Sequence, residues 1–276
     1  MGYLILSIVS STLIGIIMRL GAGRVRHGLG MLAVSYLVCT VLAGSFFGFR
    51  LTDAGPGLGM TAAMGGVNGI LYLGGFILMQ HNTRCSGVVL TSIFQKLGLL
   101  VTLAVSVILY REIPNGFQLL GAVLAVSAIL LMNGGGAETG SFRITLLWML
   151  GCCGMADAMS KIFAESGVPA LEPQFLFLTF GSAMVLCFLC MWAKGQSVGG
   201  KELLYGTLIA IPNFFCSKFL LGALERLSAI VVYPVYSVGC ILAVTLAGIC
   251  VFRERLEKRQ WIGIAVILVA LVLLNL

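Results

Sequence analysis

Ten long apolar runs constrain the fold of this chain more than any other feature of its sequence. Each run approaches the length of about 20 residues that a helix needs to cross a bilayer. The runs are continuous and do not alternate between apolar and polar residues, which favours helices over the strands of a membrane β-barrel. We therefore predict an all-α polytopic membrane protein with ten transmembrane helices. The runs lie at residues 3–20, 29–47, 60–80, 87–110, 116–133, 144–163, 174–193, 203–222, 228–252 and 260–276.

The composition supports this class and excludes others. Of the 276 residues, 59% are hydrophobic and 10% are charged, whereas soluble proteins carry roughly 25% charged residues. Ten spans use about 200 residues, which leaves little chain for a soluble domain. We therefore expect a multi-pass protein of the cell (inner) membrane, surrounded by the lipid bilayer, with no nucleic-acid partner.

The second half of the sequence repeats the first half without a gap. Residues 84–133 align with residues 226–275 at one constant spacing. Composition alone would produce matches of Leu, Ala and Val, but it would not place charged and amide residues in register. Identical residues in this alignment include Arg111 and Arg253, Glu112 and Glu254, Gln118 and Gln260, and Gly121 and Gly263.

The repeat predicts two five-helix units, at residues 1–136 and 137–276, that form one integral membrane domain. A glycine stretch at 134–136 lies between them. Because five is an odd number, the second unit enters the membrane with the orientation opposite to that of the first. Inverted repeats are typical of secondary transporters, which bind substrate near the midplane between the repeats and expose it alternately to the two sides.

Two motifs carry a resemblance to a known family: Tyr110-Arg111-Glu112 with Gln118-Leu119-Leu120-Gly121, and Phe252-Arg253-Glu254 with Gln260-Trp261-Ile262-Gly263. With them, the chain resembles the ten-helix EamA-like transporters of the drug/metabolite transporter superfamily over essentially its whole length. Ser92 departs from the family pattern, since it stands where the second half has Pro234. The resemblance implies a substrate cavity lined by helices one, three, four, six, eight and nine, and it does not indicate the substrate.

Charged side chains inside the spans are the best candidates for function, because each is costly in a membrane and must be paired or hydrated. We predict that Lys218 binds substrate, since it lies mid-span with no acid within one helical turn. Lys96 and its neighbour Gln95 lead to the same prediction. Arg19 and Lys161 are the basic residues in the first helix of each half, and they complete the cationic candidates for substrate binding.

Asp157 is the one acid inside a span. It shares a helix face with Ser160 and Lys161, at spacings of three and four residues. One interpretation is a protonatable site that couples transport to protons; the other is a structural ion pair with Lys161. The equivalent position in the first half is Gly15, so the fold itself does not require an acid there.

The neutral polar candidates lie in the third, eighth and ninth spans, the last two close to Pro212 and Pro234. Proline in a helix frees a carbonyl group, and interrupted helices are where transporters place binding sites. For the tyrosines, the alternative is ordinary packing with a hydrogen-bonded hydroxyl. The predicted substrate-binding residues of this kind are Asn68, Tyr72, Asn213, Tyr233 and Tyr236.

Few residues in the sequence could support catalysis. We expect that the protein is not an enzyme and that it has no cofactor or metal site. His27 and His81 lie at the ends of runs without acidic or nucleophilic partners. Gly195 to Lys201 resembles a phosphate-binding loop, but residue 202 is Glu instead of Ser or Thr, and the segment joins two apolar runs.

We therefore expect a monomeric secondary active transporter of a small polar metabolite. Four intramembrane cations against one acid favour an anionic or zwitterionic small-molecule substrate. Protons or a counter-transported solute are the expected coupling partners. The alternatives are an exporter of apolar or cationic drugs, a lipid-carrier flippase, and a sensor or assembly subunit that transports nothing.

Loop charges and the resemblance disagree about orientation. Loops after odd-numbered helices carry ten Lys and Arg residues, and loops after even-numbered helices carry three. The positive-inside rule then places both termini outside the cytoplasm. The resemblance implies that both termini are cytoplasmic.

Overall fold

The computed structural model describes residues 2–46, 48, 57–110, 115–133, 144–224, 229–253 and 256–273. Within those ranges the chain is helical and contains no strand. The helices are α1 Gly2–Ala22, α2 Gly28–Ser45, α3 Leu58–Ser86, α4 Val88–Lys96, α5 Leu99–Tyr110, α6 Gly116–Asn133, α7 Ile144–Ser166, a short 3-10 turn at Pro169–Leu171, α8 Glu172–Ala193, α9 Gly200–Leu224, α10 Ala229–Phe252 and α11 Lys258–Leu273.

Every predicted apolar run falls on a helix, and the expected all-α polytopic fold is confirmed. Within the part of the chain that the structure describes, six helices are by themselves long and apolar enough to cross a membrane. The fourth run differs from the prediction, because it is divided into α4 and α5 at Leu97 and Gly98. The proposed boundary at residue 136 lies outside the described residues, and so do Glu112 and Glu254.

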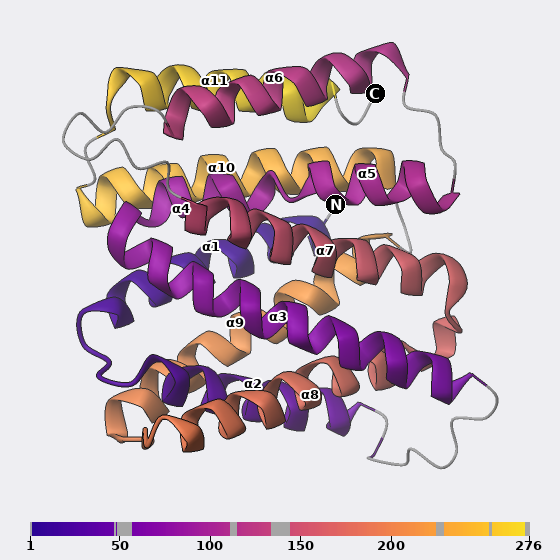
Figure 1. Cartoon of the computed structure of the whole chain (residues 1–276), viewed down its shortest axis with the longest axis vertical. Coiled ribbons are helices and arrows are strands. Elements are labelled where there is room, and N and C mark those ends of the chain that lie inside the picture. The colour runs from indigo at the N-terminus through magenta and orange to yellow at the C-terminus, as the bar shows by residue number, and fades with distance from the viewer. Residues whose placement is uncertain are drawn as a thin grey trace.

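The helices of the two halves follow the spacing of the sequence repeat. Leu58 begins α3 and Gly200 begins α9, at the same spacing that separates Gly116, the start of α6, from Lys258, the start of α11. Figure 1 shows that α1 and α7 run in opposite directions across the molecule. Equivalent helices of the two halves are therefore inverted with respect to one another.

Contacts between the halves come in equivalent pairs. Helix α1 packs on α9 as α3 packs on α7, and α2 packs on α9 as α3 packs on α8. In three further contacts, a helix of the first half packs on its own counterpart in the second half: α2 on α8, α4 on α10, and α6 on α11. In Figure 1 the α2–α8 pair forms one end of the long axis, and the α6–α11 pair forms the other.

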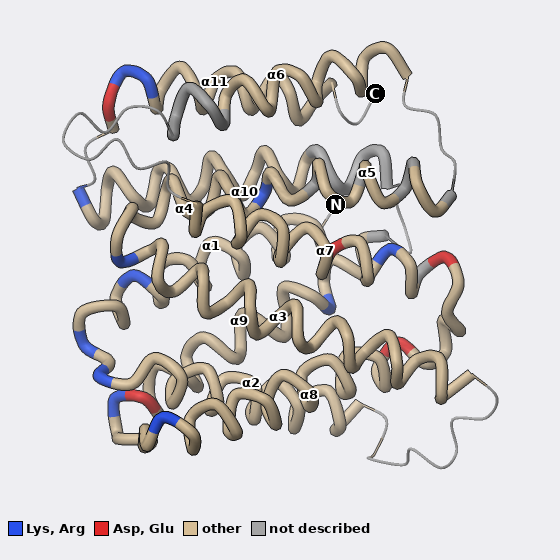
Figure 2. Tube along the Cα trace, viewed as in Figure 1, with Lys and Arg blue, Asp and Glu red and all other residues tan. Residues whose placement is uncertain are grey.

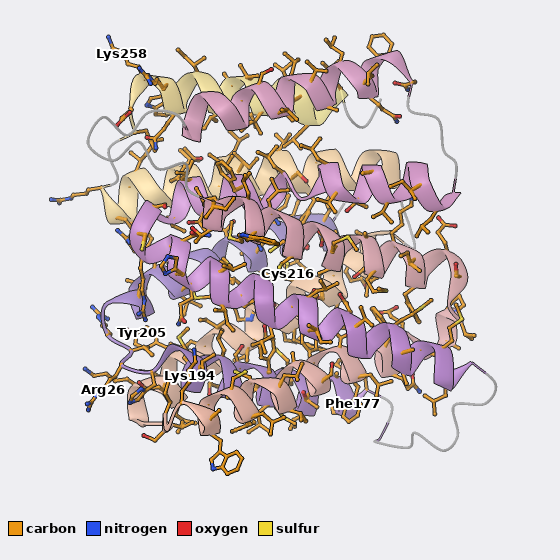
Figure 3. All side chains as sticks on the ribbon, in the orientation of Figure 1. Arg26, Phe177, Lys194, Tyr205, Cys216 and Lys258 are labelled. Carbon is orange, nitrogen blue, oxygen red and sulfur yellow. The ribbon has the colours of Figure 1, made fainter. Side chains whose placement is uncertain are left out.

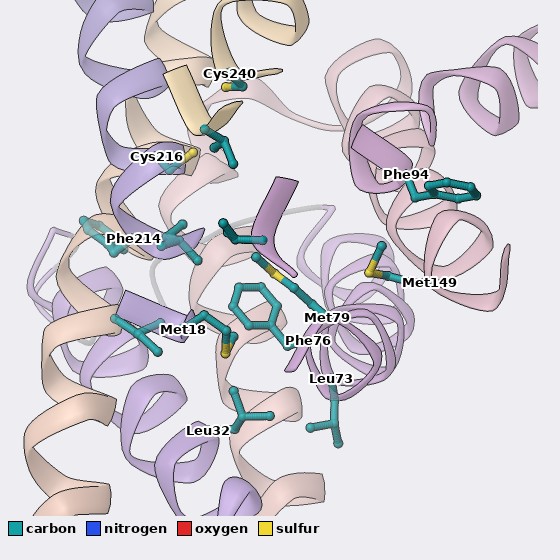
Figure 4. Packing of buried hydrophobic residues seen from close by; sticks show 14 of the residues in the cluster. Met18, Leu32, Leu73, Phe76, Met79, Phe94, Met149, Phe214, Cys216 and Cys240 are labelled. Carbon is teal, nitrogen blue, oxygen red and sulfur yellow. The ribbon is translucent and has the colours of Figure 1, made fainter. Parts of the chain in front are cut away.

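Glycine allows α3 and α8 to approach closely. A Cβ atom at Gly65 would lie 2.8 Å from Cβ of Leu178, and one at Gly69 would lie 2.9 Å from the backbone nitrogen of Ala183. No side chain fits at either place without a shift, so the two helices pack backbone against backbone. Around this contact, large apolar side chains fill the interior; Figure 4 shows Phe76, Met79 and Phe214 among them.

Basic side chains gather at one end of the helices, as Figures 2 and 3 show. We call this end the basic face and the other end the opposite face. Helices α1, α3, α8 and α10 end at the basic face, and α2, α4, α7, α9 and α11 begin there. Its described Lys and Arg residues are Arg24, Arg26, Arg84, Lys194, Lys201, Arg253, Lys258 and Arg259.

All three tryptophans of the chain lie near the basic face. Trp148 is in the first two turns of α7, Trp192 is in the last turn of α8, and Trp261 is in the first turn of α11. Their side chains are 65%, 82% and 51% exposed. Exposed tryptophans at helix ends are typical of the interface between lipid and water.

Candidate functional site

A cavity of about 120 Å³ lies between the two halves. It is lined from the first half by α1, α3, α4 and α5, and from the second half by α7, α9 and α10. These are the six spans that the resemblance implies, once α4 and α5 are counted as one. Cys216, which lines the cavity, lies near the centre of the molecule in Figure 3. Six predicted site residues line it: Tyr72, Gln95, Lys96, Asp157, Asn213 and Tyr236.

The break between α4 and α5 places Lys96 in this cavity. Lys96 is the last residue of α4, and the N–H groups of Leu97 and Gly98 donate to the carbonyls of Ile93 and Gln95 at 3.0 and 3.2 Å. A Cβ atom at Gly98 would lie 2.9 Å from Cα of Gly154 in α7. The helix therefore turns where it meets α7, and the break opens onto the cavity.

Lys96 and Asp157 face the same cavity from opposite halves. The ammonium group of Lys96 interacts electrostatically with the carboxylate of Asp157. It also lies 4.0 Å from the ring centre of Tyr236, within the range of a cation–π interaction. The Asp157 side chain is accessible in the interior because it lines the cavity. The site therefore presents one cation and one anion to a ligand.

The first half packs tightly at the position equivalent to Asp157. A Cβ atom at Gly15 would lie 3.2 Å from Cγ2 of Val88, so α1 packs closely where α7 carries Asp157. The two halves therefore share a fold but contribute different chemistry to the cavity.

Neutral polar groups complete the lining. The Tyr72 hydroxyl lies 3.4 Å from Oγ of Ser217, and the Tyr236 hydroxyl lies 3.2 Å from Sγ of Cys216. Nδ2 of Asn213 lies 3.8 Å from the sulfur of Cys39. These groups can donate and accept hydrogen bonds without adding charge.

Lys218 lies in a second cavity, of about 280 Å³, near the opposite face. Its ammonium group lies over the ring of Phe46 and interacts electrostatically with Glu172, at the start of α8. Lys218 and Ser217 are neighbours on α9, yet Ser217 lines the first cavity and Lys218 lines the second. Helix α9 therefore has a cavity on each side.

Three predicted site residues line neither cavity. The Arg19 side chain donates to the carbonyl of Thr83 at 2.7 Å, near the basic-face ends of α1 and α3. Asn68 is buried in α3 beside the close contact with α8. Lys161 is half-buried in α7, one turn beyond Asp157 towards the opposite face. A fourth predicted residue, Tyr233, has a side chain that is not among those the structure describes.

Sequence reasoning missed several residues of the two cavities. Glu172 was passed over because it lies at a helix start, yet it approaches Lys218. Ser11 and Cys216 line the first cavity, but in the sequence they are indistinguishable from other small residues within apolar runs. The available signal was weak, since a small polar residue inside an apolar run is common in packed membrane helices. In the part of the chain that the structure describes, no three His, Cys, Asp or Glu residues are grouped as a metal ion would require.

Comparisons with known proteins agree with the geometry. The EamA-like transporter family matches residues 143–276. A protein of Pseudomonas syringae, named as a probable 4-amino-4-deoxy-L-arabinose-phosphoundecaprenol flippase subunit ArnE, is 45% identical over 97 residues, which cover 32% of this chain and 89% of that protein. An uncharacterised protein of Haemophilus influenzae is 26% identical over 204 residues, covering 71% of this chain and 69% of that one. A solved crystal structure shares the fold with a TM-score of 0.64 at 13% identity, over 99% of this chain and 96% of the other.

Proposed function

Because the chain belongs to the EamA-like transporter family, as a multi-pass protein of the inner membrane, we propose that it is a secondary active transporter of a small polar metabolite. In this proposal the substrate is anionic or zwitterionic and binds between the two halves. The halves then rearrange, so that the cavity faces each side of the membrane in turn. The protein acts as a monomer and by transport, not by catalysis.

The observation that supports the substrate class most is the pair of opposite charges in the central cavity. Lys96 can bind the carboxylate or phosphate of a substrate, while Asp157 can bind an ammonium group or a proton. Lys96 belongs to the first half and Asp157 to the second, so a bound zwitterion would bridge the two halves that move during transport. Tyr72, Gln95 and Asn213 supply hydrogen bonds that fix its orientation.

A lipid-linked substrate is the second candidate. The name of the Pseudomonas syringae relative describes a compound with an amino group and a phosphate. Attached to a lipid carrier, these two groups could still bind to Asp157 and Lys96.

Export of apolar or cationic drugs is the third candidate, and in that case the two charged residues would only neutralise one another.

Transport into proteoliposomes tests the proposal. Amino acids, sugar phosphates, quaternary amines and a lipid-linked amino sugar are offered in turn to the purified protein. We expect saturable uptake of a zwitterion or an anion, and at least about a tenfold loss in Lys96→Met, which corresponds to roughly 1.4 kcal/mol of binding. Lys194→Met is the matched control, because Lys194 is exposed at the basic face. Preference for quaternary amines, with Lys96→Met fully active, would contradict the proposal.

A further inference from the structure

A buried acid ties the two halves together at the basic face. Glu202, at the start of α9, is only 4% exposed. One carboxylate oxygen accepts from the backbone N–H groups of Arg26 and His27 at 2.9 and 3.0 Å, and the other accepts from Gly199 at 3.1 Å. The segment after α1 is thereby fastened to the first turn of α9.

Two further polar contacts join the halves at the same face. The Arg24 side chain donates to the hydroxyl of Tyr205 in α9 at 2.8 Å. Asn82 in α3 donates to the carbonyl of Thr145 in α7 at 3.1 Å, and the Thr145 hydroxyl donates back to Asn82 at 2.7 Å. The helices that line the central cavity are thus held together where they approach the basic face.

The opposite face differs at the equivalent positions. The repeat places Met60 where the other face has Glu202, and Val168 and Pro169 where it has Arg26 and His27. Proline has no N–H group, so one of the backbone hydrogen bonds has no counterpart there. Instead, the start of α3 makes an apolar contact: a Cβ atom at Gly57 would lie 3.0 Å from Cγ2 of Val168.

The second cavity is a further feature of the opposite face. The second cavity lies there, among Tyr3, Phe46, Glu172 and Gly222, between the ends of α1, α2, α8 and α9. Tyr3 is the repeat equivalent of Thr145, which makes the reciprocal bonds with Asn82 at the basic face. At the position equivalent to Thr145, the opposite face therefore has an aromatic residue, which lies beside the second cavity.

We propose that Glu202 is a positioning residue for transport that holds the basic face closed in the resting protein. Charge-assisted hydrogen bonds must all break before α1 and α9 separate at the basic face. Nearer the opposite face, the same two helices are joined by a neutral hydrogen bond, from the Ser7 hydroxyl to the carbonyl of Cys216 at 3.1 Å, and neutral hydrogen bonds are weaker than charge-assisted ones.

Sided thiol labelling tests the proposal without any substrate. It rests on the proposed function only through alternating access, so a wrong substrate class would leave its outcome unchanged. A membrane-impermeant maleimide is added to one side of sealed vesicles holding the full chain, and each cysteine is read by mass spectrometry. Cys153 lines the central cavity and reports its opening. Cys85, exposed beside Arg84, marks access to the basic face.

We expect Cys153 in the native protein to be protected when the reagent is added on the side from which it labels Cys85. Glu202→Met, which installs the residue of the equivalent position, should raise labelling of Cys153 from the basic face by about tenfold or more. Glu257→Met is the control, since Glu257 is exposed at the same face. It should leave the labelling unchanged.

The outcomes show whether the contacts of Glu202 hold the basic face closed or are merely structural. A folded Glu202→Met protein in which Cys153 stays protected from the basic face would overturn the proposal. If that variant does not fold, Tyr205→Phe decides, because it removes only the bond to Arg24. A rise of about twofold or more in Tyr205→Phe supports the proposal, and no rise overturns it.

Discussion

Single residues distinguish the two halves of this protein. Asp157 and Gly15 occupy equivalent positions, yet one lines the cavity and the other packs within 3.2 Å of Val88, measured from a Cβ atom built on the glycine. An acid in a membrane must be hydrated, protonated or paired. Asp157 has both a cavity and Lys96 beside it, which suits a group that exchanges a proton during transport.

Asp157→Asn should separate coupling from movement. The amide keeps the shape of the side chain but cannot take up a proton. We expect substrate uptake driven by an imposed pH gradient to fall by about tenfold or more, while exchange of labelled for unlabelled substrate continues. Glu165→Gln, an exposed acid later in the same helix, is the control. Equal loss of both activities would instead indicate a structural role for Asp157.

Lys218→Ala should abolish transport and leave the protein folded. Lys218 is half-buried, so its removal exposes little of the core, but it removes the cation from the second cavity and leaves Glu172 without that neighbour. Transport and thermal unfolding are measured on the same preparation. Lys201→Ala is the control, because Lys201 is exposed on the same helix. Full transport by Lys218→Ala would show that the second cavity takes no part.

At the scale of single residues, the sequence revealed the charged side chains inside the membrane but not their partners. Lys96, Asp157 and Lys218 were found because charge inside an apolar run is rare. Glu172 and Glu202 were missed because an acid at the end of a run is commonly a solvated residue. Which end of which helix approaches a lysine depends on packing between the halves, and a single run does not contain that information.

At the scale of helices, the apolar runs predicted the number and order of spans but not the position of the break. Interruptions were expected near the prolines, yet α9 and α10 continue as helices through Pro212 and Pro234. Neighbouring helices compensate for the lost hydrogen bond of proline in membranes. The break occurs instead at Gly98, because that residue meets Gly154 of another helix.

Gly69→Ala should destabilise the protein, and Gly66→Ala should not. An added Cβ at Gly69 meets the backbone of α8, whereas one at Gly66 has no neighbour within 4 Å. Overpacking costs about 1–3 kcal/mol, and alanine in place of an unstrained glycine is neutral or slightly stabilising. Thermal unfolding in detergent should therefore show a lower midpoint for Gly69→Ala only. Equal midpoints would mean that α3 and α8 separate readily.

At the scale of the whole molecule, the repeat predicted the inverted arrangement before any contact was known. Its register places the helix starts at Leu58 and Gly200, and at Gly116 and Lys258, in matching positions. Register could not reveal the contacts of Glu202 with Arg26 and His27, because these depend on which groups meet across the halves.

Fusions to the C-terminus should decide the orientation. We expect a C-terminal green fluorescent protein to fluoresce and a C-terminal alkaline phosphatase to be inactive, as the family resemblance implies. The contrary charge bias rests partly on the last loop, where Glu254 and Glu257 lie among the basic residues. An active phosphatase fusion would show that the basic face is cytoplasmic and that loop charge governs insertion.

The position of the tryptophans has an optical consequence. Trp148, Trp192 and Trp261 account for all 3 tryptophans of the chain, and each is exposed beside the basic face. Their ultraviolet emission therefore comes from a single interface of the bilayer. Iodide added to one side of sealed vesicles should quench this emission strongly from the basic side and weakly from the other. The unmodified protein thus carries its own spectroscopic label for sidedness.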